Sequence, residues 1–221
     1  MVRTDEQIKT DIVNRLNWDS RVDASDVLVE VNDGIVTLSG SVSRYGARRA
    51  ASDAALYTSG VTSVDNGVKV VYPPSTVVPL DSAIKANAES VLTWNADIDA
   101  TEIEVNVKDG VVTLKGTVPH YWQKDKAEDL VSDLSGVLLV DNQIDIVPTE
   151  RISDELIAKD IRDELERSLA TPGDVEVKVE NGVVTLTGTV VGYVERQAAY
   201  NAAVRTAGVR NAINKTSILF K

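Results

Sequence analysis

The chain has no cysteine and a single histidine, His120, among its 221 residues. Disulfide frameworks, zinc–thiolate sites, iron–sulfur clusters and cysteine nucleophiles are therefore excluded, and one chain cannot build a multi-histidine metal centre. Aromatic residues make up only 5% of the sequence, so we expect a core of valine, isoleucine, leucine and alanine. No cofactor is expected.

Long apolar runs are also missing. No segment approaches the roughly 18 apolar residues that read as a membrane-spanning helix, and the N-terminal residues lack the apolar run of a signal peptide. The sequence as it stands predicts a cytoplasmic protein, or a periplasmic one if an export signal has been removed.

Basic residues are outnumbered, which gives a net charge of −11. The charge is uneven: residues 1–72 carry −2, residues 73–148 carry −8 and residues 149–221 carry −1. Nucleic-acid binding needs clustered lysine and arginine, so this balance argues against it. Anionic partners should avoid the acidic middle third.

The main positive feature is an internal repeat. The segments 31–40, 107–116 and 179–188 are near copies of a Val-x-(Asp/Asn)-Gly-x-Val-Thr-Leu-x-Gly pattern, centred on Gly34, Gly110 and Gly182. A tyrosine follows each of these glycines after 11 residues, a Gly-Val pair after 26 and an asparagine after 32: Tyr45, Tyr121, Tyr193; Gly60, Gly136, Gly208; Asn66, Asn142, Asn214. The spacing of about 70 residues indicates small domains rather than solenoid repeats.

Each unit shows the same order of elements. Apolar residues at i, i+4 and i+8 predict a first helix, with Thr4, Asp81 and Ser153 as N-caps. An alternating strand, a tight Asp-Gly or Asn-Gly turn and a return strand predict a hairpin. A second helix begins near the repeated tyrosine and is expected to end at the Gly-Val glycine as a left-handed cap. A last strand follows, with Ile213, Ile218 and Phe220 expected in the core of unit three.

The predicted fold class is α+β, with three tandem αββαβ domains, each a three-stranded mixed sheet covered on one face by two helices. The units span residues 1–72, 80–147 and 152–221. A proline-rich linker at 73–79, expected to be extended, and a short linker at 148–151 separate them.

These residues resemble three tandem BON domains (bacterial OsmY and nodulation). The family pattern is a Val-x-Val-x-(Asn/Asp)-Gly-Val-Val-x-Leu-x-Gly-x-Val hairpin, then a helix ending in Gly-Val, then a strand with asparagine. The resemblance covers nearly the whole chain. It implies an αββαβ fold, a role in osmotic or envelope stress, association with phospholipid surfaces and no catalytic residues.

No catalytic or metal site is expected from the residues themselves. His120 occurs in one unit only and no Gly-x-Ser-x-Gly elbow exists, so a solvent-exposed loop histidine is the preferred interpretation. The carboxylates of residues 97–104 lack the glycine and the ligand spacing of a calcium loop, which favours a solvated acidic loop. The repeated glycines do not sit in the strand–loop–helix order of a phosphate loop.

The repeated tyrosines are the candidate binding residues. Each sits where a strand passes into a helix, beside cations, and could seat a phospholipid headgroup or a protein partner. The alternative interpretation, which we favour here, is that each ring plugs the end of the core and leaves its hydroxyl in water. The candidate set is Arg44, Tyr45, Arg48, Arg49, Tyr121, Trp122, Lys124, Tyr193 and Arg196.

Trp18 and Trp94 lie at equivalent places near the ends of two first helices, and we expect them to cover the core.

Two functions stay open: peripheral association with phospholipid, and a scaffold that presents repeated surfaces to envelope or stress-protein partners. The oligomeric state is left open by the sequence.

Overall fold

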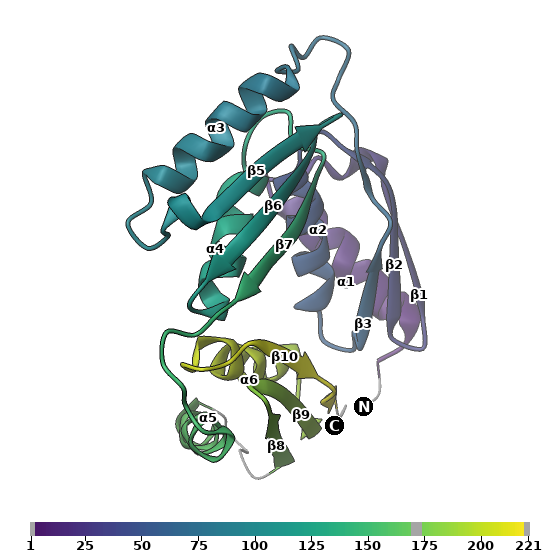
Figure 1. Ribbon diagram of the computed structural model, residues 1–221. Helices are drawn as coiled ribbons and strands as arrows, with labels where there is room; N and C mark the ends of the chain where they lie inside the picture. Colours follow the sequence, from purple (N-terminus) through teal and green to yellow (C-terminus); the bar gives the residue numbers. More distant parts are fainter. Residues whose placement is uncertain (1–2, 169–173, 219–221) are drawn as a thin grey trace.

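The computed structural model describes residues 3–168 and 174–218. It contains three units, each with two helices on one face of a small mixed sheet (Figure 1). The α+β prediction is confirmed. Phe220, expected in the last strand, lies outside the described residues.

Unit one contains α1 (Asp5–Trp18), β1 (Val27–Asn32), β2 (Ile35–Val42), α2 (Tyr45–Leu56), β3 (Ser63–Asn66) and β4 (Lys69–Val70). Strand β2 is central: it pairs antiparallel with β1 and parallel with both β3 and β4. The third strand of the sheet is thus split into two short pieces.

Unit two contains α3 (Asp81–Thr93), β5 (Ile103–Lys108), β6 (Val111–Val118), α4 (Tyr121–Ser132) and β7 (Leu139–Ile146). Unit three contains α5 (Asp154–Ser168), β8 (Val175–Glu180), β9 (Val183–Val190), α6 (Tyr193–Arg205), β10 (Asn211–Asn214) and β11 (Ser217–Ile218). The pairing is the same as in unit one, except that β7 runs unbroken along β6.

The core of each unit follows the predicted periodicity. The first helices bury the residues spaced four apart, and the return strands bury alternate residues. In unit three the last strand turns Ala212, not Ile213, toward the core: Ile213 is 40% exposed. The repeat offset points to Ala212, which stands where Val64 and Val140 stand in the other units.

The hairpin turns have the expected left-handed backbone at both central residues. Asp33 and Gly34 have φ of 49° and 74°, and the copies agree within a few degrees. A carboxylate from the start of each first helix accepts both turn amides: Asp5 in unit one, Asp81 in unit two and Asp154 in unit three. The first helix is thereby fastened to its hairpin.

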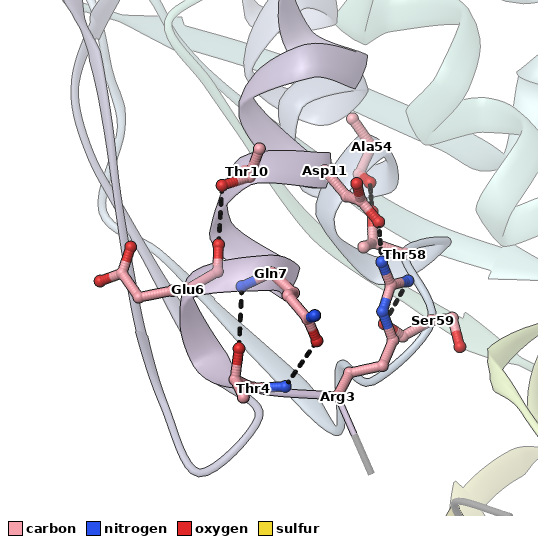
Figure 2. Close-up of polar contacts among 9 residues, drawn as sticks. All are labelled: Arg3, Thr4, Glu6, Gln7, Thr10, Asp11, Ala54, Thr58 and Ser59. Atoms are coloured by element: carbon pink, nitrogen blue, oxygen red, sulfur yellow. Dashed lines mark hydrogen bonds and ion pairs between the residues drawn. The ribbon is translucent and has the colours of Figure 1, made fainter. Parts of the chain in front are cut away.

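This clamp corrects one predicted cap. Thr4 and Ser153 accept backbone amides as N-caps should, and Figure 2 shows the reciprocal Thr4–Gln7 bonds of a capping box, with Arg3 bridging Asp11 and the Ser59 carbonyl. Asp81 is instead the first helical residue, and Leu80 occupies the cap. The Asp81 carboxylate is already engaged by the turn amides.

The Gly-Val glycines have left-handed backbone but do not cap the second helices, which end three or four residues earlier. They pack under the first helices: a Cβ on Gly136 would stand 2.5 Å from Ile84 Cδ1.

The repeated asparagines tie the second helix to the last strand. Asn66 Nδ2 donates to the Arg48 carbonyl, and Asn66 Oδ1 accepts from Val68 N–H.

Candidate functional site

The three second helices, α2, α4 and α6, lie toward the middle of the molecule, where the units meet (Figure 1). Most of the candidate tyrosines and cations lie on these helices. Their contacts decide which of them are free to meet a partner.

Between units one and two, Arg49 of α2 reaches the end of α4. Its guanidinium pairs with Asp129 Oδ1 at 2.5 Å and donates to Ser132 Oγ at 2.9 Å. Tyr45 is 7% exposed and packs within the hydrophobic core of unit two rather than that of its own unit. The favoured interpretation, a ring that plugs its own core, is therefore wrong for Tyr45.

Between units two and three, Tyr200 of α6 donates its hydroxyl to the Tyr121 hydroxyl of α4 at 3.2 Å. Burial, followed by this bond, raises the pKa of Tyr200. The Tyr121 hydroxyl, expected to stay in water, is thus engaged by the neighbouring unit.

Between units three and one, the Tyr193 ring of α6 meets the Tyr57 ring edge-on, with centroids 5.0 Å apart. Arg196 donates to the Thr62 carbonyl at 3.0 Å. Burial raises the pKa of Tyr193, whose hydroxyl donates to Gln197.

These junctions share one direction. Residues in the first half of each second helix contact the second helix of the next unit, in its later part (α2 on α4), near its middle (α4 on α6) or just after its end (α6 on α2). Each contact is head-to-tail, joining different surfaces of the two units, and the third contact joins unit three to unit one. The three units therefore form a closed ring.

The remaining candidate cations behave differently from one another. Arg48 stacks over Tyr45, 5.8 Å from the ring centroid, and donates to the carbonyls of Val68 and Asn66. Lys124 is half-buried, and its carbonyl accepts from Asn142. Arg44 is exposed, and the one side-chain bond described for it is a 3.4 Å contact to the Arg21 carbonyl.

The aromatic residues at the helix ends also depart from expectation. Trp18 and Trp94 are 87% and 86% exposed, so neither covers a core. Each stands at the C-terminal end of its first helix, past the last buried position, and points its ring to solvent. His120 is not a free loop residue: it precedes α4, half-buried, and stacks against Trp122.

A cleft of about 520 Å³ opens between units one and two. Unit one contributes Arg21, Arg44, Tyr45 and Tyr72, the linker contributes Pro73 and Thr76, and unit two contributes Asp133. Arg21 is held by Asp19, whose carboxylate accepts three hydrogen bonds from the guanidinium, and this arginine lowers the pKa of Asp19. The cleft is missed by sequence reasoning because its walls come from different units.

The acidic loop of unit two is internally bonded. Asp97 pairs with Lys126, and Asp99 accepts from the amide and hydroxyl of Thr101, which lowers the Asp99 pKa. Within residues 3–168 and 174–218, no group of three or more histidines and carboxylates is placed to hold a metal ion. The helices in this same part of the chain include none long and apolar enough to cross a bilayer.

The BON domain family matches residues 4–72, 80–148 and 153–219, which is most of the sequence. The chain belongs to the BON domain family. Each αββαβ unit is one BON unit, and the shared hairpin, glycine and asparagine positions are the ones whose bonds are described above.

One curated relative is osmotically-inducible protein Y of Escherichia coli strain K12, 29% identical over 126 residues. That match covers 56% of this chain and 63% of the relative, less than two thirds of its length. Two solved structures of CdsD, a structural protein of the type III secretion system of Chlamydia trachomatis, align with 95% and 97% of this three-BON chain and with 96% and 93% of their own. Their identities are 19% and 18% with a TM-score of 0.27, a likeness too slight to bear on function.

Proposed function

We propose that this chain is a non-enzymatic, osmotic-stress-related binding protein that associates peripherally with phospholipid surfaces. Membership of the BON family and the similarity to osmotically-inducible protein Y support the stress-related role. Both compartments considered above present a phospholipid leaflet, so the proposal holds for a cytoplasmic or a periplasmic location.

The observation that carries the lipid proposal is an exposed tryptophan, Trp18, followed closely in the chain by Arg21, which Arg44 contacts. Trp18 is 87% exposed at the end of α1, Arg21 follows three residues later, and Arg44 contacts the Arg21 carbonyl. Tryptophan favours the membrane–water interface, and arginine can hold a phosphate through two hydrogen bonds. One end of unit one therefore offers the two residue types that a headgroup region attracts.

Unit two is a poorer membrane contact. Trp94 is equally exposed, but the loop that follows it carries Asp97, Asp99 and Glu102 with no cation. The loop after Trp18 also has three carboxylates, Asp19, Asp23 and Asp26, but it includes Arg21. The middle third has a charge of −8, which an anionic surface repels. Trp94 is therefore the natural control for Trp18.

The scaffold alternative is less well supported. A scaffold of repeated surfaces would present the same second-helix residues to partners, yet these residues contact one another at the three junctions. Arg48 and Arg49, two cations of the candidate set, make internal bonds as well. Arg44 is therefore the candidate arginine to replace with glutamine.

The test is co-sedimentation of the full chain with phosphatidylcholine vesicles containing phosphatidylglycerol, at low and high salt. We expect weak, salt-sensitive binding that Trp18→Ala and Arg44→Gln each reduce several-fold, while Trp94→Ala has little effect. Absence of binding by the parent chain at low salt would contradict the proposal and favour the scaffold.

A further inference from the structure

The linker between units one and two is an exposed apolar loop. No charged residue occurs between Lys69 and Asp81, although 26% of the chain is charged. Four side chains in this stretch are largely exposed: Val71 at 57%, Val77 at 90%, Val78 at 46% and Leu80 at 77%. We call residues 71–80 the apolar loop. Such a concentration of exposed aliphatic side chains marks an interaction surface.

The apolar loop is not the extended spacer predicted from its prolines. Thr76 N–H donates to the Pro73 carbonyl at 2.8 Å, which closes a tight turn. Both ends of the loop reach the same residue of unit two. Gly136 N–H donates to the Tyr72 hydroxyl at 2.8 Å, and Pro79 Cδ lies 3.2 Å from where a Cβ on Gly136 would stand.

A loop whose two ends meet and whose middle is exposed is a compact surface loop of the kind often used for function. Three prolines restrict its backbone, and Tyr72 fixes its base with a second bond to the Val137 carbonyl. Val77 and Leu80 are therefore presented without a large entropy cost on binding.

Cations stand beside this loop. Tyr72, Pro73 and Thr76 line the same 520 Å³ cleft as Arg21 and Arg44. The cleft also holds Asp133, and Arg21 is paired with Asp19, so Arg44 is the cation with most donors left for an outside anion. A loop with exposed aliphatic side chains, whose first residues line a cleft with arginine, matches the layers of a bilayer surface, where acyl chains lie under phosphates.

We infer that the apolar loop is the membrane-docking element of the chain, inserting Val77 and Leu80 below the headgroups of an anionic phospholipid surface while Arg44 and Arg21 face the phosphates. The occupant is a lipid surface rather than a protein groove, because the loop is uncharged and aliphatic and its first residues share a cleft with Arg21 and Arg44. This inference rests on the proposed function and assigns it to a loop centred on the linker between the first two BON matches.

The test compares two charge-matched double variants of the full chain on vesicles of phosphatidylcholine and phosphatidylglycerol. Val77→Asp with Leu80→Asp should lower the partition coefficient tenfold or more. Val191→Asp with Val194→Asp adds the same charge at two exposed valines of unit three and should change it less than twofold. Thermal unfolding of both variants checks that the fold is retained.

A second readout does not depend on those variants. The chain has no cysteine, so Val77→Cys or Val194→Cys introduces one unique site for an environment-sensitive fluorophore. The label at position 77 should shift its emission to the blue on vesicles, and the label at 194 should not. If the parent chain binds no vesicles, the proposed function and the inference both fail. If it binds while label 77 stays in water and the loop variant binds normally, the inference alone is overturned.

Discussion

Arg49 and Asp129 form an ion pair between α2 of unit one and α4 of unit two, with 2.5 Å between Nη2 and Oδ1. The same guanidinium donates to Ser132, so one arginine holds two turns of the neighbouring helix. Both charged side chains are about half exposed, and an exposed pair of this kind contributes at most about 1 kcal/mol. Its value lies in fixing how the two helices are aligned, while burial of Tyr45 supplies the larger stabilisation.

Tyr45→Ala should destabilise unit two although the residue belongs to unit one. The ring is 7% exposed in the core of unit two, and emptying such a site costs about 3 kcal/mol. Hydrogen exchange should therefore quicken in β6 and β7. Tyr193→Ala, which removes a half-buried ring at another junction, serves as the control and should leave unit two protected.

Asp125→Asn should stabilise the chain at pH 7 to 8 and not at pH 4. Burial, followed by repulsion from Glu128 and Asp129, raises the pKa of Asp125 to about 6. A carboxyl whose folded pKa lies above its unfolded value costs stability once ionised, and this cost disappears as the pH falls through 6 toward 4.

The gain should be on the order of 1 kcal/mol, because the side chain is only half-buried and solvent screens its charge. Urea unfolding across this pH range measures it. Asp145→Asn removes the same charge at an exposed position of β7 and is the matched control; equal behaviour of the two variants would disprove the assignment.

Gly116→Ala should weaken unit two by about 2 kcal/mol or more. Gly116 has a φ of 135°, and an added Cβ would stand 1.8 Å from the Glu102 carbonyl oxygen, a contact that backbone must move to relieve. Gly192→Ala is the matched control, since no atom lies within 4 Å of its Cβ position. Urea midpoints that fall equally for the two variants would refute the steric argument.

Asp154→Ala should cost about 2 kcal/mol in unit three by orphaning two turn amides. Its carboxylate accepts from Asn181 N–H at 2.7 Å and Gly182 N–H at 2.9 Å, and charge-assisted bonds of this length are among the stronger ones. Glu155→Ala removes the neighbouring exposed carboxylate and should change the unfolding free energy by less than about 0.5 kcal/mol. Thermal melts of the two variants decide the matter.

The sequence predicted the units well because its periodicity reports contacts within a unit. The residues of α1 spaced four apart, the alternating strands and the Asp-Gly turns each specify a local partner, and repetition removes ambiguity. The carboxylate clamp was within reach too: Asp5, Asp81 and Asp154 precede the turn glycines by 29, 29 and 28 residues.

The candidate site could not be predicted in the same way. Whether Tyr45 plugs its own unit or the next depends on how two units are placed, and no residue spacing encodes that placement. Trp18 and Trp94 illustrate a related limit, because an apolar residue at a helix end, two positions past the last buried residue, fits a core lid and an exposed anchor equally well. The prolines of residues 73–79 predict an extended spacer, but they do not reveal the turn between Pro73 and Thr76 or the exposure of the valines.

The return of unit three to unit one has a consequence for shortened forms of the chain. A fragment lacking one unit would expose two surfaces without their partners: the first half of one second helix, and the part of another second helix that such a half contacts. These two unlike surfaces could pair between separate molecules. Head-to-tail contacts that do not close propagate. Deleting a unit should therefore convert a chain that closes on itself into one that forms head-to-tail polymers. Light scattering would measure this as an average assembly size that increases with protein concentration.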